Sequence, residues 1–157
     1  MKRFTNALAL LFLASFAAPS LVRAADVALV SGLAGEDAYK VRGAWYYPKA
    51  DATYDQEGEA SWYGGPRMHG RRTASGEKMD QNALTAAHPT LPMSSLVRVT
   101  NLTNNRSVIV RINDRGPFVR GRIIELTRQG ARQLGYEAQG VARVRVQVIP
   151  TDAALPQ

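Results

Sequence analysis

The stretch Arg111-Ile112-Asn113-Asp114-Arg115-Gly116-Pro117-Phe118 places a carboxylate where an alternating segment gives way to a turn. Residues 107–112 alternate polar and apolar side chains, which predicts a half-buried strand. Gly116 and Pro117 then direct the backbone out of the sheet. We therefore expect Asp114 at a strand end, on a rigid edge where its side chain can face a ligand. The alternative is a turn held by a salt bridge.

The segments around this stretch predict a small all-β domain with loop-rich connections. Alternating or β-rich runs predict further strands over residues 59–64, 96–100, 123–126 and 141–148. Residues 101–106 form a turn between two of these strands, and residues 83–87 predict a single helical turn. Thr127 is a suitable N-cap for one short helix that ends at Leu134 before Gly135. So few short strands would leave bare edges in an open sheet, which favours a closed barrel.

The first 24 residues have the pattern of a secretory signal peptide. Lys2 and Arg3 precede an apolar run, and Val22-Arg23-Ala24 offers a cleavage site. The apolar run is shorter than the roughly 20 residues of a membrane span, so we expect cleavage and no membrane anchor; a retained anchor is the alternative. The expected organisation is a signal peptide (1–24), a flexible lead with a short aromatic cluster (25–57), the barrel (58–150) and a tail (151–157).

The composition excludes some kinds of chemistry and favours an anionic partner. The chain has no cysteine, which excludes disulfides, thiolate metal ligands and cysteine nucleophiles, and we expect neither a metal nor another cofactor. Residues 57–150 hold fourteen basic side chains against seven acidic ones. Because an exported protein does not meet nucleic acid, the charge favours a polyanionic cell-wall polymer as partner, with general solubility as the alternative. We expect a secreted, periplasmic monomer.

Five short sequence motifs occur along the chain in an order that indicates a known family. They are Ser61-Trp62-Tyr63-Gly64, His69-Gly70, Thr73-Ala74-Ser75-Gly76-Glu77, residues 82–88 (Asn-Ala-Leu-Thr-Ala-Ala-His) and Asn113-Asp114-Arg115-Gly116-Pro117. With these blocks the chain closely resembles the rare lipoprotein A family, the septal-ring lytic transglycosylases. The resemblance implies a six-stranded double-psi β-barrel. It also implies an enzyme that cleaves the MurNAc–GlcNAc β-1,4 bond of peptidoglycan glycan strands and leaves 1,6-anhydro-muramyl ends, in wall remodelling and daughter-cell separation.

The chain departs from the family pattern in several places. Many members carry a lipid-modified Cys and a C-terminal peptidoglycan-binding domain. This sequence has no Cys and we expect no such domain, so septal recruitment through it is not implied. Four residues, 65–68, separate Tyr-Gly from His-Gly where three are usual, and Glu125 stands where Asp is usual. Both changes flank the expected substrate site, so we expect them to alter substrate fit.

The implied reaction needs one acid–base group and no metal. An acid protonates the leaving oxygen, and a base then takes the proton of the sugar's own 6-hydroxyl, so a single carboxyl can do both. Asp114 is the first candidate, although Arg111 and Arg115 beside it favour its ionised form and hence a structural salt bridge. Glu77, on a Gly-rich loop, is either the acid itself or a stabiliser of positive charge at the anomeric carbon.

The remaining candidates have structural alternatives. Glu77 can equally be a solvated residue paired with Lys78 or Arg72. His88 is the third catalytic candidate, able to hydrogen-bond a carboxylate or a sugar hydroxyl, and its alternative is a satisfied structural histidine. Candidates for substrate binding are Trp62, Tyr63, His69, Arg72, Thr73, Asn113 and Arg115. Of the two aromatic residues, which alternate sides in a strand, at least one is expected in the core.

Two other functions fit the same fold. One is a non-catalytic, expansin-like module that binds peptidoglycan or polysaccharide. The other is an inverting glycoside hydrolase, in which water replaces the 6-hydroxyl as nucleophile. The three functions leave different ends on a glycan strand: an anhydro end, a reducing end, or no new end.

Overall fold

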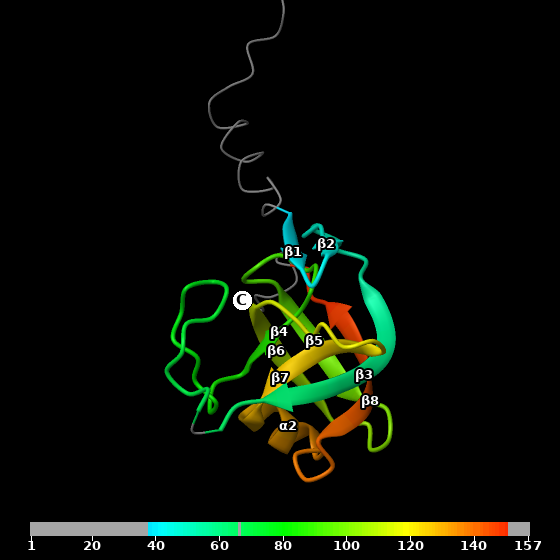
Figure 1. The fold of residues 1–157 in the computed structure, drawn as a ribbon. Coiled ribbons are helices and arrows are strands. Elements are labelled where there is room, and N and C mark those ends of the chain that lie inside the picture. Colours follow the sequence, from blue (N-terminus) through cyan, green and yellow to red (C-terminus); the bar gives the residue numbers. More distant parts are fainter. Residues whose placement is uncertain (1–37, 66, 151–157) are drawn as a thin grey trace, which may run out of the picture. The chain divides into compact units, whose positions relative to one another are not determined.

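The computed structural model describes residues 38–65 and 67–150, so the expected signal peptide and tail lie outside the described residues (Figure 1). The elements are β1 (Tyr39–Val41), β2 (Ala44–Tyr46), β3 (Asp55–Tyr63), β4 (Thr85–Ala87), β5 (Leu96–Asn101), β6 (Ser107–Asp114), β7 (Arg122–Thr127), α2 (Arg128–Leu134) and β8 (Val141–Val148). In this part of the chain we find no helix with both the length and the apolar character needed to cross a membrane.

Six strands close into a barrel in the order β3-β7-β4-β6-β5-β8, and β8 pairs again with β3. The pairs β3–β7 and β4–β6 are parallel, whereas the other pairs are antiparallel. Closure pairs the backbone N–H and C=O groups that the edge strands of an open sheet would leave unpaired. The predicted six-stranded double-psi barrel with one short helix is confirmed.

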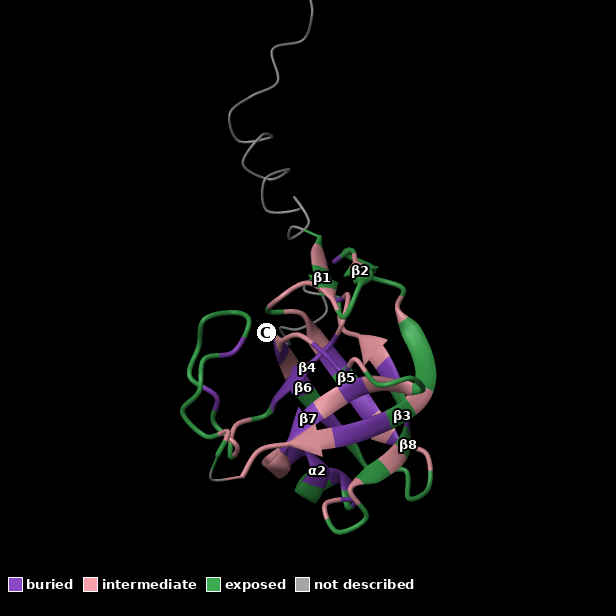
Figure 2. Cartoon of the chain, in the orientation of Figure 1, coloured by how far each residue is buried: buried purple, intermediate pink, exposed green. Residues whose placement is uncertain are grey.

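The barrel interior is filled by alternate residues of the strands (Figure 2). Its fully buried members include Val97, Val99, Val110, Ile112, Ile124, Leu126, Val144 and Val146. Their spacing of two along each strand is the one predicted from sequence, because successive side chains of a strand point to opposite faces. The residues between them therefore lie on the outer face of the barrel, where a ligand can reach them.

The helix forms as predicted, with one difference at its start. Gly135 ends α2 in the left-handed conformation, with φ 77°. Thr127 precedes the helix but makes no side-chain cap, because its hydroxyl instead donates to the Ala83 carbonyl at 2.6 Å. The helix is thereby tied to the segment that leads into β4.

One local prediction is wrong, and the structure differs from expectation at two further places. Residues 83–87 do not form a helical turn, because Thr85–Ala87 is a strand that pairs with β6 on one side and β7 on the other. For the lead only a short aromatic cluster was predicted, and there β1 and β2 pair as an antiparallel hairpin. Arg42 and Gly43 make its turn with φ values of 48° and 86°. The barrel itself begins at Asp55 and not at Gly58.

Candidate active site

Asp114 is the last residue of β6 and is half-buried. A register shift between Ala86 and Ala87, the partners of Ile112 and Asp114, interrupts the alternation that buries Val110 and Ile112. Its Oδ1 accepts hydrogen bonds from the backbone N–H of Ala74 at 2.9 Å and of Arg115 at 2.8 Å. Within residues 38–65 and 67–150, Oδ2 makes no hydrogen bond. The carboxylate is thus oriented through one oxygen, and the other oxygen is left for a ligand.

The two neighbouring arginines are engaged with other partners. Arg111 donates two hydrogen bonds to Glu77, at 2.6 and 2.9 Å. Arg115 donates to the carbonyls of His88 at 2.9 Å and Leu91 at 2.6 Å. Arg115, expected to bind substrate, therefore supports the turn that follows β4. These contacts weaken the argument for a structural salt bridge at Asp114.

Glu77 lies in the long loop between β3 and β4, close to the end of β6. Besides Arg111, its carboxylate accepts a hydrogen bond from Asn113 Nδ2 at 3.2 Å. These hydrogen bonds, that from Arg111 first, lower the pKa of Glu77 to about 2. Glu77 is therefore ionised at neutral pH, and its partner is Arg111 rather than the expected Lys78 or Arg72. Its side chain is 42% exposed and can still meet a ligand.

The tip of this loop is attached to the end of β6. Ser75 N–H donates to the Asn113 carbonyl at 3.1 Å, next to the Ala74 bond to Asp114. Thr73, a predicted binding residue, is buried, and its hydroxyl contacts Ser75 Oγ at 3.0 Å. Asn113 is also buried, and in the described residues its Oδ1 has no hydrogen-bond partner. The structure thus brings Glu77, Thr73 and Asn113 to Asp114.

His88 is 1% exposed, directly after β4. Its Nδ1 accepts hydrogen bonds from the N–H groups of Thr90 at 3.1 Å and Leu91 at 2.9 Å. The ring proton therefore sits on Nε2, 3.0 Å from Tyr54 Oη. Burial first, and then the positive charge of Arg115, lowers the pKa of His88 to about 3.

This environment favours the structural alternative for His88 over the predicted catalytic role. The neutral, covered ring cannot touch a substrate, and it fits the structural alternative. What His88 gives the site is its backbone N–H, which donates to the Asp114 carbonyl at 3.1 Å. The side chain fixes the turn that carries this N–H.

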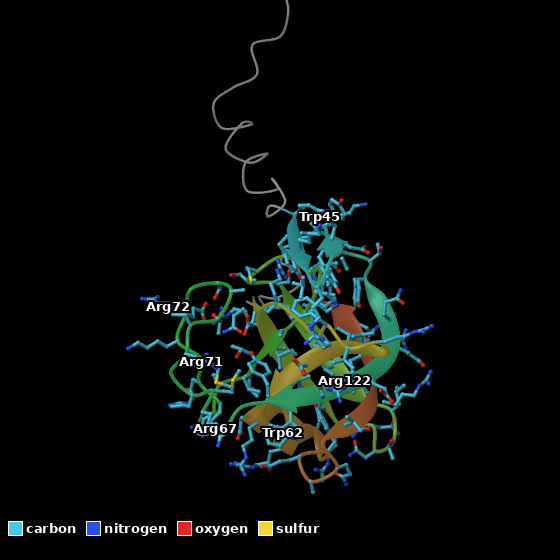
Figure 3. The ribbon with its side chains drawn as sticks, in the orientation of Figure 1. Trp45, Trp62, Arg67, Arg71, Arg72 and Arg122 are labelled. Atoms are coloured by element: carbon cyan, nitrogen blue, oxygen red, sulfur yellow. The ribbon has the colours of Figure 1, made fainter. Side chains whose placement is uncertain are left out.

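Three predicted binding residues lie elsewhere, and Figure 3 labels two of them, Trp62 and Arg72. Trp62 faces α2, where its Nε1 donates to the Glu137 carbonyl at 3.0 Å and its ring lies 6.0 Å from the Arg128 guanidinium. His69 lies in the loop, 3.9 Å from Asp80, and is half-exposed. Arg72 is exposed in the same loop and donates to the Gly76 carbonyl at 2.8 Å. Within the described residues, none of these side chains makes a hydrogen bond or an ion pair with Asp114.

Two more residues lie toward this site: Tyr63 ends β3, and Glu125 of β7 pairs with Ala87, the register partner of Asp114. Burial, followed by the negative charges of Asp114 and Glu125, raises the pKa of the Tyr63 hydroxyl. Glu125 is a departure from the family pattern that flanks the expected substrate site, and the sequence predicted no catalytic or binding role for it. No local signal identifies it, because its position depends on the register of strands that are distant in sequence. No group of three or more potential metal ligands occurs among the described residues.

Comparison with known proteins agrees with this fold. Residues 55–146 match the family described as lytic transglycolase. A Neisseria meningitidis serogroup B protein named endolytic peptidoglycan transglycosylase RlpA is 48% identical over 150 residues, covering 92% of this chain and 62% of the relative. A Campylobacter jejuni protein of the same name is 54% identical over 112 residues, 71% of this chain and 40% of the relative. The chain thus spans only part of the length of these relatives.

Two solved structures share the fold at low sequence identity. A Streptomyces papain inhibitor matches 62% of this chain and 96% of its own, with a TM-score of 0.51 and 20% identity. A Clavibacter michiganensis expansin in complex with cellohexaose matches 66% of this chain and 54% of its own, with a TM-score of 0.52 and 15% identity. Because the family match extends over most of the barrel, the chain belongs to the lytic transglycolase family.

Proposed function

We propose that this chain is an endolytic peptidoglycan lytic transglycosylase that acts as a monomer on glycan strands in the periplasm. The observation that carries the proposal is the Asp114 carboxylate, with Oδ1 fixed by two backbone N–H groups and Oδ2 left for a ligand. The names of the relatives support this activity. Export rests on the N-terminal pattern of residues 1–24.

In the proposed reaction, Asp114 acts first as acid and then as base. Protonated Oδ2 gives its proton to the oxygen that links MurNAc to GlcNAc, and the bond from the MurNAc anomeric carbon to that oxygen breaks. The resulting carboxylate takes the proton of the MurNAc 6-hydroxyl while its oxygen bonds to the anomeric carbon. This step closes the 1,6-anhydro ring, restores the protonated acid and consumes no water.

Glu77 has a different role in this proposal. Because hydrogen bonds hold its pKa at about 2, it cannot deliver a proton at neutral pH. Its negative charge can stabilise the positive charge that develops at the anomeric carbon. It also keeps the Arg111 guanidinium in an ion pair at 2.6 Å. We therefore assign proton transfer to Asp114 and electrostatic stabilisation to Glu77.

Substrate contacts are proposed for the residues that the fold brings to Asp114. The half-buried ring of Tyr63 can stack on a sugar, as aromatic side chains commonly do with apolar faces. Asn113 and Thr73 position Glu77 and its loop. The exposed arginines of that loop, Arg67, Arg71 and Arg72, provide positive charge for glycan-linked carboxylates (Figure 3).

The products of a digestion decide between the functions. Purified chain is incubated with glycan strands, and the fragments are treated with borohydride and weighed, with the Asp114→Asn variant as control. Anhydro ends lack a free hemiacetal, so they resist reduction and are lighter by one water than hydrolysed ends. Anhydro ends from the wild type alone support the proposal. Reducing ends indicate a hydrolase, and uncut strands indicate the expansin-like binding module; both outcomes contradict it.

A further inference from the structure

The β1–β2 hairpin is hydrogen-bonded to the turn that follows β4. Tyr39 Oη donates to the Pro89 carbonyl at 2.7 Å, and the backbone N–H of Lys49, just after the hairpin, donates to the Thr90 carbonyl at 2.9 Å. This turn lies next to the end of β6, because β4 and β6 are paired strands. The hairpin is therefore attached beside the strand end that carries the proposed acid–base.

The inner face of the hairpin packs on the segment that follows β6. Tyr39 and Tyr46 are register partners, and their rings stack at 5.3 Å. The Phe118 ring lies 6.2 Å from the Tyr39 ring and 5.1 Å from the Tyr46 ring. The Arg115 guanidinium lies 5.7 Å from the Tyr39 ring. These four side chains attach the hairpin to the segment that directly follows Asp114.

The outer face of the hairpin carries exposed aromatic and basic side chains. Lys40 and Trp45 are register partners, and the alternation of the strands places them on the face opposite to the two stacked tyrosines. Trp45, labelled in Figure 3, is 56% exposed, and Tyr47, just after β2, is 66% exposed. Lys40 Nζ lies 5.6 Å from the centroid of the Trp45 ring. Neither Trp45 nor Tyr47 belongs to the core of the described residues.

This combination of side chains suits a carbohydrate polymer that carries carboxylates. An aromatic ring can stack on the apolar C–H face of a sugar while its polar edge stays hydrated. Residues 38–49 hold three exposed basic side chains, Lys40, Arg42 and Lys49, and no acidic one. Their charge attracts the carboxylates of peptidoglycan. Because the same residues include no Leu, Ile or Phe, a lipid surface fits the hairpin less well.

We propose that the outer face of the β1–β2 hairpin is a further carbohydrate-binding site, in which Trp45 and Tyr47 stack on sugars of the glycan strand beside the bond that Asp114 cleaves. The inference rests on the proposed function and extends it. A strand that lies over Asp114 continues past the two turns to which the hairpin is attached. The hairpin thus adds affinity for long strands and takes no part in the chemical step.

Binding is tested in the Asp114→Asn background, which leaves the strands uncut. Each protein is mixed with soluble long glycan strands, and the dissociation constant is measured by calorimetry. Trp45→Ala should weaken binding about ten-fold, and Tyr47→Ala about three-fold. Trp45→Phe keeps an aromatic ring and should lose less than about three-fold. Trp45→Leu, which is apolar but has no ring face, should lose as much as Trp45→Ala.

Kinetics of the active chain separate binding from chemistry. Since the hairpin would hold the substrate and the transition state equally, Trp45→Ala should raise KM for long strands about ten-fold and leave kcat within about two-fold. On the shortest fragment that the chain cuts, which does not extend to the hairpin, KM should change less than about two-fold. A fall in kcat with KM unchanged would contradict a binding role.

Controls separate the hairpin from other exposed apolar positions and from other partners. Ile109→Ala removes a 47% exposed side chain on the outer face of β6 and should leave glycan binding unchanged. Melting temperatures check that each variant is folded. Equal glycan binding by wild-type and substituted hairpins overturns the inference. So does a Trp45→Ala defect confined to anionic lipid vesicles, or confined to dimer formation in sedimentation. Because binding is measured with a chain that cannot cut, an inactive wild type would count against the proposed function alone.

Discussion

Two regions of the molecule offer an acidic side chain to the same site, and they hold it in different ways. Asp114 ends an eight-residue strand that pairs with β5 and β4. Glu77 belongs to the loop between β3 and β4, and a bidentate ion pair with Arg111 fixes it. The backbone therefore orients Asp114 without occupying Oδ2, whereas side-chain partners use both oxygens of Glu77. Two carboxylates of similar chemistry are thereby suited to different roles.

The regions are also joined, since the loop supplies part of the Asp114 environment. Ala74 N–H donates to Asp114 Oδ1, and Ser75 N–H donates to the carbonyl of the preceding residue, Asn113. The strand end fixes the loop, and the loop in turn orients the carboxylate. Substitutions that affect one region and not the other test how far the division of roles holds.

The largest effect is expected from Asp114→Asn. The amide oxygen can still accept the two backbone N–H groups, so the fold should be kept, while proton transfer is lost. We expect kcat to fall by at least about 100-fold. The measurement is the rate of anhydro-end release, with the melting temperature as a check on folding. Full activity in a folded variant would remove Asp114 from the mechanism.

The second largest effect is expected at His88, whose side chain holds the turn beside the end of β6 where Asp114 lies. His88→Phe keeps a ring of similar shape but leaves the N–H groups of Thr90 and Leu91 and the hydroxyl of Tyr54 without their partner. Leaving such buried groups unpaired should lower the free energy of unfolding by about 2–4 kcal/mol. Urea unfolding measures this loss. His69→Phe, at a half-exposed histidine in the loop, is the matched control and should change stability little.

His88 also gives stability a pH dependence with a defined sign. Its pKa is about 3 in the folded chain, whereas an unfolded histidine has a pKa of about 6.5. Between these values the unfolded chain binds the extra proton, so stability should fall as pH drops through this window, by up to about 1.4 kcal/mol per unit. His88→Phe should lack this slope. An equal slope in both proteins would contradict the neutral, buried state.

Glu77→Gln tests the loop region and should have a smaller effect than Asp114→Asn. The change removes the charge but keeps the shape, and we expect kcat to fall about ten-fold through lost electrostatic stabilisation. Loss of the exposed ion pair should cost less than about 1 kcal/mol of stability. Since the folded pKa is depressed to about 2, the wild-type advantage should be present above about pH 4.5 and vanish toward pH 2. A loss of turnover equal to that of Asp114→Asn would show that the loop carboxylate shares proton transfer.

Sequence reasoning worked best where a residue's environment is local. The strands β5, β6 and β8 carry alternation over six to eight residues, and their predicted bounds agree closely with the structure. Strand β4 was missed because its three residues are all buried and show no alternation. The β1–β2 hairpin was missed although Gly43 marks its turn, because each strand is only three residues long.

The site residues also fall into those that the local sequence predicts and those that depend on strands distant in sequence. The position of Asp114 at a strand end follows from its own neighbours in the sequence. The burial of His88 and the place of Glu125 depend on β4 lying between β6 and β7, and no short-range pattern indicates that order. Trp62 and Tyr63 alternate as expected, but which of them reaches the site depends on α2 covering one side.

The smallest effect concerns the hairpin, which supports the strand-end region from outside the barrel. Tyr39 Oη donates to the Pro89 carbonyl at 2.7 Å, and its ring stacks on Tyr46 at 5.3 Å and lies 6.2 Å from Phe118. Tyr39→Phe removes the hydrogen bond and keeps the ring, so stability should fall by about 1 kcal/mol, measured from the urea midpoint. Turnover should change less than about two-fold, because the strand pairing of β6 already holds Asp114. A drop as large as that of Glu77→Gln would mean that the hairpin, and not the sheet alone, orients the strand-end carboxylate.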